Sequence, residues 1–244
     1  MNPGARLVIL GKQGAGKGTQ AVRLSRHYVV PHVATGDTFR AAIRSGSEFG
    51  QKARKYLDAG ELVPDEIVIG MVRERLTHDD TTHRGFILDG FPRTAQQADA
   101  LMRILEPQGL DLAINLEIDT THVLRRLAAR RVCSDCGANY SVVDNPPRVR
   151  GICDVCGGEV VQRDDDTESA IRRRLELYQR ETAPLIEWFR GRGLLASLDA
   201  LGSPDDVTDR LVAEVDERKR GRVQLVSQWH FGVHAQAQRP TAPG

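Results

Sequence analysis

The sequence lacks the features that mark several specialised classes of protein. No apolar run approaches the roughly 18 residues that a membrane-spanning helix needs, so we expect no membrane partner. The 34 Lys and Arg residues nearly balance the 33 Asp and Glu residues, and the net charge of +1 argues against a protein that coats nucleic acid by charge alone. The first residues carry no secretory signal, so we expect a cytoplasmic protein.

Cysteine is also scarce, and it is confined to one segment. The chain has 4 cysteines, and all of them lie between residues 133 and 156. A disulfide framework would spread its cysteines along the chain, so this clustering favours a metal site in a reducing compartment.

The length of 244 residues suits one large domain, or one domain with a smaller one inserted.

Short apolar runs alternate with helical patterns along most of the chain. The apolar runs lie at residues 6–10, 29–34, 86–88, 112–118 and 194–198. The helical patterns lie at residues 16–27, 38–45, 64–77, 94–106, 120–130 and 167–190, with Asp37 as the predicted N-cap of the second. The alternation predicts an α/β fold, with a parallel five-stranded sheet flanked by helices. Ligands bind such sheets at the carboxyl ends of the strands, where Gly11, Thr35 and Asp89 fall.

Two segments break this alternation. Residues 131–163 are rich in glycine, carry the cysteines and are too polar for a central strand or helix, which indicates an insertion. Residues beyond about 218 show no helical or strand period, so we expect a disordered tail there.

A glycine-rich motif follows the first predicted strand. The run Gly11-Lys12-Gln13-Gly14-Ala15-Gly16-Lys17 matches the phosphate-loop pattern G-x-x-x-x-G-K between a strand and a helix. Its glycines let backbone N–H groups face an anion at the helix N-terminus, and Lys17 supplies a positive charge for the phosphates. Gly18 stands where Ser or Thr usually holds Mg²⁺, and Thr19 follows it. The alternative is a glycine-rich turn that binds no ligand.

Further motifs resemble the adenylate kinases, a family of nucleoside monophosphate kinases, over residues 5 to 217. The matching segments are Gly11–Thr19, Thr35-Gly36-Asp37 with Arg40, Gly60-Glu61-Leu62-Val63, Asp89-Gly90-Phe91-Pro92-Arg93-Thr94 with Gln97, Arg130-Arg131-Val132, Asn145-Pro146-Pro147, Arg163-Asp164-Asp165, Arg174 and Thr182-Ala183-Pro184-Leu185. The sequence departs from the family pattern at Lys12-Gln13, where Ala-Pro is common, and the tail lies outside the pattern.

The resemblance implies a monomer that transfers a phosphoryl group reversibly from Mg-ATP to AMP and gives two ADP. The implied catalytic residues are Lys17, Asp89, Arg93, Arg130, Arg163 and Arg174, with Asp89 holding Mg²⁺ through water. The implied ATP-binding residues are Gly14, Ala15, Gly16, Lys17, Gly18, Thr19, Arg130, Tyr140 and Gly202. The implied AMP-binding residues are Thr35, Arg40, Glu61, Leu62, Val63, Gly90, Phe91, Pro92, Arg93, Gln97, Arg163 and Arg174.

The resemblance also divides the chain into parts. It implies a core at residues 1–129 and 164–217, a monophosphate-binding segment at 34–63 within this core, and an inserted lid at 130–163. The predicted disordered tail occupies residues 218–244.

The chemistry of phosphoryl transfer agrees with a site built from arginines. Catalysis of this reaction consists of positioning and charge stabilisation, and the phosphate of AMP is already an anionic nucleophile. The H-R-D motif of protein kinases and the Asn-Lys-x-Asp motif of GTPases are both missing. Three alternatives stay open: another monophosphate kinase of the UMP/CMP type, a zinc-bearing nucleotide-binding regulator without turnover, and ordinary surface roles for single arginines.

The cysteines have the spacing of a zinc ribbon. They follow the pattern Cys133-x2-Cys136-x16-Cys153-x2-Cys156. Four thiolates fill a tetrahedral Zn²⁺ site and leave no place for water, so the predicted zinc is structural. Two disulfides, a redox pair and a nucleic-acid-binding ribbon are the alternatives. The insert carries four acidic residues beside Arg148 and Arg150 and so presents no basic face, which argues against a nucleic-acid partner.

Overall fold

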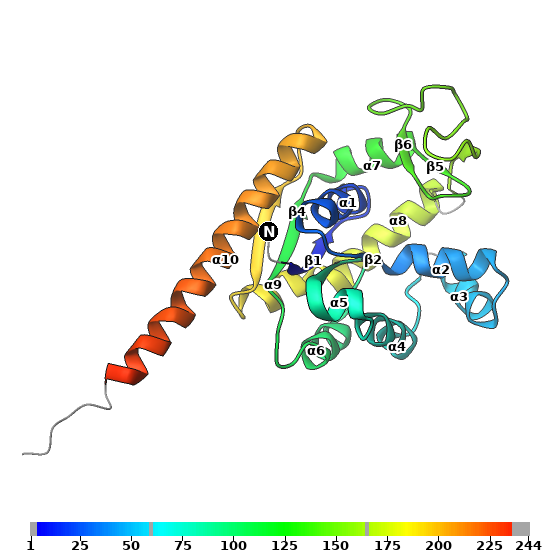
Figure 1. Ribbon diagram of the computed structural model, residues 1–244. Helices are drawn as coiled ribbons and strands as arrows, with labels where there is room; N and C mark the ends of the chain where they lie inside the picture. Colours follow the sequence, from blue (N-terminus) through cyan, green and yellow to red (C-terminus); the bar gives the residue numbers. More distant parts are fainter. Residues whose placement is uncertain (1–3, 59–60, 164–165, 236–244) are drawn as a thin grey trace, which may run out of the picture.

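A parallel sheet forms the centre of the protein (Figure 1). The computed structural model describes residues 4–58, 61–163 and 166–235. The strands are β1 (Ala5–Gly11), β2 (His32–Ala34), β3 (Gly85–Asp89), β4 (Leu112–Glu117) and β8 (Leu195–Asp199). They form a five-stranded sheet in the order β2-β3-β1-β4-β8, and every pairing is parallel. The predicted α/β fold is therefore confirmed, and the carboxyl ends of the strands lie at one edge.

Helices cover both faces of this sheet. The first face carries α1 (Lys17–Tyr28), α7 (Thr120–Ala129), α8 (Glu168–Leu177) and α10 (Pro204–Ala235). The second face carries α2 (Thr35–Arg44), α3 (Glu48–Asp58), α4 (Asp65–Leu76), α6 (Ala95–Ile104) and α9 (Pro184–Arg190). Leu7 and Ile9 of β1 enter the first core, whereas Val8 and Leu10 enter the second. Burial on both faces explains why β1 is apolar throughout.

Two helices and a π-helical turn add to the predicted elements. These elements are α3, α5 (Asp79–Arg84) and the π-helical turn Tyr178–Thr182, which joins α8 to α9. Helix α5 is short and polar and offers little apolar period in the sequence, whereas α3 carries Ala53 and Tyr56, which are three residues apart and pack in the second core. Within the described residues, no helix is long and apolar enough to cross a membrane.

The insert forms a small sheet of its own, which Figure 1 shows beyond α7. Its antiparallel strands are β5 (Arg130–Cys133), β6 (Asn139–Ser141) and β7 (Val160–Val161), in the order β6-β5-β7. Its hydrophobic cluster contains Cys133, Tyr140 and Cys153 as fully buried members. So small an apolar cluster cannot supply the stability of an independent unit, which makes a metal cross-link physically reasonable.

The start of α2 differs from the prediction. The helix begins at Thr35, and Ala34 rather than Asp37 is its N-cap. Asp37 instead lies in the first helical turn, where a carboxylate interacts favourably with the helix dipole, and it forms an ion pair with Arg40.

The end of the chain also differs from the prediction. Helix α10 continues to Ala235, so the expectation of disorder does not hold for residues 218–235 (Figure 1). A helix that already exists adds residues without repeating the cost of nucleation, so it continues without an apolar period. Residues 236–244 lie outside the described residues, as do Gly60, Asp164 and Asp165 of the family motifs.

Candidate active site

The phosphate loop joins β1 to α1 at the carboxyl edge of the sheet. Gly14 and Gly16 have φ values of +81° and +98°, which side chains other than glycine rarely adopt. The Nζ atom of Lys17 donates to the carbonyl oxygens of Gly11 at 2.8 Å and Lys12 at 2.9 Å. The ammonium group therefore holds the end of the phosphate loop against its beginning.

Burial weakens the basicity of Lys17. It lowers the pKa of Lys17 from 10.5 to about 8, against the opposing charge of Asp89 and with a smaller contribution from Arg93 and Arg130. A buried cation that lacks full solvation gains strongly when an anion arrives. The loop is thus electrostatically prepared for phosphate.

Asp89 ends β3 next to the phosphate loop. Its Oδ2 atom lies 3.6 Å from His32 Nε2 on the neighbouring strand β2, and a Cβ atom at Gly18 would lie 3.4 Å from the same oxygen. Burial acts to raise the pKa of Asp89, but His32, Lys17 and Arg93 together hold the pKa below its usual value. Asp89 is therefore an ionised oxygen donor, which suits Mg²⁺ held directly or through water.

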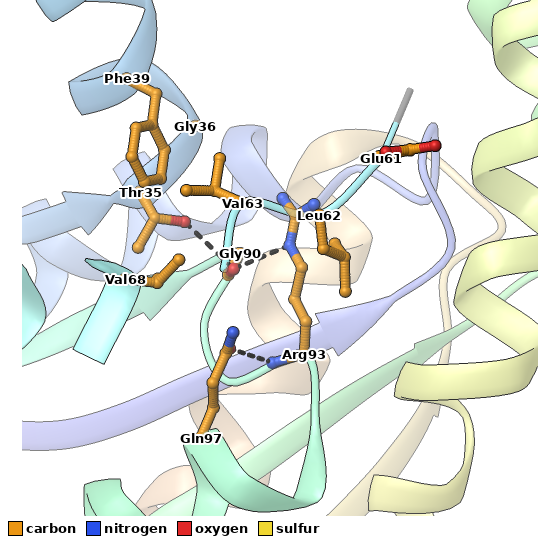
Figure 2. A pocket seen from close by; sticks show the side chains of 10 residues that line it. All are labelled: Thr35, Gly36, Phe39, Glu61, Leu62, Val63, Val68, Gly90, Arg93 and Gln97. Carbon is orange, nitrogen blue, oxygen red and sulfur yellow. Dashed lines mark hydrogen bonds between the residues drawn. The ribbon is translucent and has the colours of Figure 1, made fainter. Parts of the chain in front are cut away.

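A cavity lies between α2, the chain before α4 and the loop after β3 (Figure 2). Together with the open space at its mouth it measures about 350 Å³. Its lining includes these predicted AMP-binding residues: Thr35, Glu61, Leu62, Val63, Gly90, Arg93 and Gln97. Sequence reasoning missed Phe39 and Val68, whose apolar side chains also line the cavity. An apolar wall with convergent polar groups suits a planar base.

Hydrogen bonds hold the polar groups of this cavity in place. Thr35 Oγ1 donates to the carbonyl oxygen of Gly90 at 3.0 Å, and Arg93 Nε donates to the same oxygen at 2.8 Å (Figure 2). The backbone N–H of Arg93 donates to Gln97 Oε1 at 2.8 Å, and Gln97 Nε2 donates to Asp65 Oδ1 at 2.7 Å. Because Gln97 is bonded at both ends of its amide, its orientation in the cavity is fixed.

Five predicted AMP-binding residues lie outside the lining of this cavity: Arg40, Phe91, Pro92, Arg163 and Arg174. Phe91 is fully buried in the second core, and Pro92 is buried beside it, so their side chains serve packing and any contact with AMP falls to their main chain. Arg40 projects from α2 and pairs with Asp37.

A cluster of charged side chains covers the phosphate loop. Arg130 Nε donates to Asp166 Oδ2 at 2.7 Å, and Arg130 Nη2 donates to the other carboxylate oxygen. The Asp166 side chain is 0% exposed, so this two-point pair is well shielded from water. Arg174 approaches the same place from α8 and lies near Gln13 of the loop. The structure thus brings Arg130 and Arg174 together beside Gln13 of the phosphate loop.

Two contacts connect the region after the insert with the segment around α2. Arg163 Nη2 lies 4.0 Å from Asp37 Oδ1, and Arg173 of α8 forms an ion pair with Glu61. Arg163 thus lies next to Asp37 of α2, and its contact with AMP stays a prediction. Glu61 both pairs with Arg173 and lines the cavity.

Sequence reasoning missed Arg126, which contacts the phosphate loop from α7. Its Nη1 atom donates to the carbonyl oxygen of Ala15 at 3.4 Å, and Nη2 donates to that of Ala200 at 3.1 Å. Gly202, with a φ of +110°, follows two residues later in the same loop. Arg126 thus joins the phosphate loop to the chain after β8, where the resemblance implies an ATP contact.

The four cysteines come together at the tip of the insert. Their sulfur atoms all lie within 4.8 Å of one another, and none forms a disulfide. Gly137 N donates to the Cys133 carbonyl at 3.1 Å and Gly157 N to the Cys153 carbonyl at 2.9 Å, so each cysteine pair sits on a tight turn. A tetrad of free thiols at this separation is compatible with a structural zinc site.

Tyr140 supports this cluster. Its hydroxyl accepts from the backbone N–H of Asp154 at 2.8 Å and donates to Cys153 Sγ at 3.3 Å, which lowers the pKa of that thiol. Because the side chain is buried and bonded in this way, a contact between Tyr140 and ATP would have to come from its main chain.

Comparison with known proteins gives the family. A model of the adenylate kinase family matches residues 9–194. The adenylate kinase of Thermodesulfovibrio yellowstonii is 48% identical over 215 residues, which cover 87% of this chain and 100% of that protein. The chain belongs to the adenylate kinase family. The adenylate kinase of Streptomyces griseus is 46% identical over 219 residues (88% and 100% coverage), and that of Acidothermus cellulolyticus is 49% identical over 210 residues (85% and 96%).

Membership of the adenylate kinase family confirms the resemblance drawn from the motifs. The family match includes the phosphate loop, the cavity, the arginine cluster and the insert with its cysteines. The individual roles of the predicted site residues stay predictions.

The structure also places three predicted ATP-binding residues of the phosphate loop and α1. Thr19 is exposed on the first turn of α1, Ala15 is buried within the loop, and Gly18 lies beside Asp89.

Proposed function

We propose that this chain transfers the γ-phosphoryl group of ATP to the phosphate of AMP, reversibly and with Mg²⁺. An oxygen of the AMP phosphate forms a bond to the γ-phosphorus, the bond from that phosphorus to the β,γ-bridging oxygen breaks, and two ADP molecules result. The acceptor is already an anion, so the reaction needs no catalytic base. Family membership and the geometry of the site support this proposal.

The position of Arg93 is the observation that carries the proposal. Its side chain lines the monophosphate cavity, while its charge also acts on Lys17 and Asp89 at the phosphate loop. Arg174 and Arg40 act on Arg93 in turn. The two halves of the site therefore meet at one guanidinium group, where a phosphoryl group passing between two nucleotides would lie.

The proposed roles follow from these positions. Lys17 and the loop N–H groups bind the β and γ phosphates, and Arg130 and Arg174 stabilise the charge that develops on the transferred group. Arg93 and Arg163 hold phosphate oxygens near the cavity with planar, bidentate geometry. Arg40 binds the phosphate of AMP, while Thr35 and Gln97 contact its adenosine.

Two metals fit the residues present. Asp89 would hold Mg²⁺ through water, and bound Mg²⁺ neutralises charge on the phosphates. Cys133, Cys136, Cys153 and Cys156 would hold a structural Zn²⁺, with the sulfur separations described above as support. The four free thiols also support action in the cytoplasm, and the family resemblance supports a monomer. Light scattering on the purified protein tests the monomer.

A direct assay tests the proposed activity. The purified protein is incubated with Mg-ATP and, separately, AMP, CMP, UMP or GMP, and the nucleotide products are separated by chromatography. We expect ADP from AMP at a rate well above that of the other diphosphates, and no transfer when EDTA removes Mg²⁺. A folded protein that forms no ADP would refute the proposal, and a preference for CMP or UMP would reassign the acceptor.

A further inference from the structure

Gln13 of the phosphate loop lies between two of the arginines to which the proposed function gives a role. One of the two terminal atoms of its side-chain amide, oxygen or nitrogen according to the orientation of the amide, lies 3.1 Å from Arg130 Nη2 and 2.9 Å from Arg174 Nη1. Arg130 begins β5 at the entrance to the insert, whereas Arg174 lies in α8. One side chain of the loop therefore contacts guanidinium groups from two separate elements.

The neighbours determine which end of the amide faces the arginines. Guanidinium groups only donate hydrogen bonds, so an amide nitrogen at this position would face two donors and could form a hydrogen bond with neither. That orientation gains one bond of 3.3 Å, to Asp166 Oδ1. With the oxygen in this place, Gln13 accepts two shorter bonds from charged donors, which are the stronger kind. The amide oxygen therefore faces Arg130 and Arg174.

The loop is anchored so that this oxygen stays in place. Lys12, the residue before Gln13, points toward the start of α7 and donates through Nζ to the Ile118 carbonyl at 3.2 Å and to Thr120 Oγ1 at 2.9 Å. Asp166 fixes Arg130 from another direction through its two-point ion pair. Gln13 supplies a further link, because its oxygen is bonded to both arginines and offsets the repulsion between their like charges.

We propose that Gln13 is a positioning residue that sets the spacing of Arg130 and Arg174 above the phosphate loop. The pair is then arranged before the nucleotide arrives, so that less reorganisation is needed in the transition state. This inference rests on the proposed function.

Three variants separate positioning from packing. Gln13→Met keeps the length of the side chain and removes the acceptor, whereas Gln13→Glu keeps an acceptor with the same reach. Gln179→Met makes the same chemical change at an exposed residue of the π-helical turn and serves as the control. Loss of one or two hydrogen bonds should lower kcat of Gln13→Met about 5- to 10-fold, with KM for AMP unchanged because Gln13 lies outside the cavity lining.

The remaining variants and a second measurement complete the test. Gln13→Glu should keep most of the wild-type kcat, and Gln179→Met all of it. In nucleotide-free protein, ¹⁵N NMR should show shifted Arg130 and Arg174 side-chain signals in Gln13→Met and unchanged signals in Gln179→Met. Wild-type kcat in Gln13→Met, or an equal loss in Gln13→Glu, overturns the inference. If the wild-type protein forms no ADP, the proposed function fails by itself, and unchanged NMR signals in Gln13→Met would still overturn the positioning role.

Discussion

Replacing Lys17 by methionine should stabilise the nucleotide-free protein while it removes activity. The side chain keeps a similar length and loses its charge. The ammonium group is held in the loop by two carbonyl oxygens, but burial places it in an environment that disfavours a cation. Turnover should fall by several orders of magnitude, because this charge is directed at the phosphates.

The pKa gives the size of the stability effect. A fall from 10.5 to about 8 corresponds to about 3 kcal/mol of unfavourable free energy for the charged form in the folded protein. Methionine also leaves the carbonyls of Gly11 and Lys12 without this donor, which costs about 1 kcal/mol each. The net stabilisation at pH 7 should therefore be about 1–2 kcal/mol.

The pH dependence of the free energy of unfolding tests whether burial of the Lys17 charge causes this difference in stability. Above pH 8 the folded protein loses the Lys17 proton while the unfolded chain keeps it, so the wild-type free energy of unfolding rises. Above pH 8 the wild type should gain about 1.4 kcal/mol per pH unit on the variant, so that the two free energies of unfolding become equal near about pH 9 and the wild type is the more stable above that pH.

Urea unfolding followed by circular dichroism measures both effects from pH 6.5 to 9.5. Lys52→Met, a change at an exposed lysine of α3, is the matched control and should alter the free energy of unfolding by less than about 0.5 kcal/mol. The prediction is refuted if Lys17→Met is less stable than wild type at pH 7 and the difference between the two free energies of unfolding does not change with pH. Burial would then not disfavour the charged form of Lys17.

Three further predictions concern other parts of the molecule. Arg93→Lys should lower kcat by about 100-fold, since a planar fork becomes a point charge; steady-state kinetics that stay near wild type would make Arg93 a local structural residue. Elemental analysis should find one zinc per chain, and the Cys133→Ser, Cys153→Ser double variant should lose it, melt at a lower temperature and still transfer phosphate where it remains folded; absence of zinc under reducing conditions contradicts this. Truncation after Gly221 should leave kinetics unchanged, because Val215 is the last α10 residue in the described core; a large loss of activity or stability would show that the removed residues pack against the core.

The sequence predicts the sheet well because its strands differ sharply from their surroundings. Each is a short apolar run followed by glycine or a polar residue, and in the central strands β1, β3 and β4 burial on both faces makes the run continuous. The short polar helix α5 has no apolar stripe and escapes the same reasoning, whereas α3 is missed although its Ala53 and Tyr56 pack in the second core. The start of α2 is missed for a related reason, since backbone geometry at Ala34 rather than the side chain of Asp37 begins that helix.

The candidate site is only partly readable from the sequence. Glycine spacing specifies the phosphate loop, because backbone conformation there excludes other residues. The partners of the arginines are set by distance in space: Asp166 pairs with Arg130 across 36 positions of the chain, and Arg126 reaches Ala200 across 74. No periodic pattern links residues so far apart, so Arg126 and the role of Gln13 emerge from the structure.

The carboxylates that already accompany the arginines change what nucleotide binding means physically. Asp166 is buried and holds Arg130 in place, whereas Asp37 is exposed and pairs with Arg40, the residue to which the proposed function gives the phosphate of AMP. At Arg40, binding would then exchange one anion for another, because phosphate oxygens would take the place of the Asp37 carboxylate. Fewer small ions leave the site for solution than would leave bare arginines, so nucleotide affinity should decline only gently as ionic strength rises.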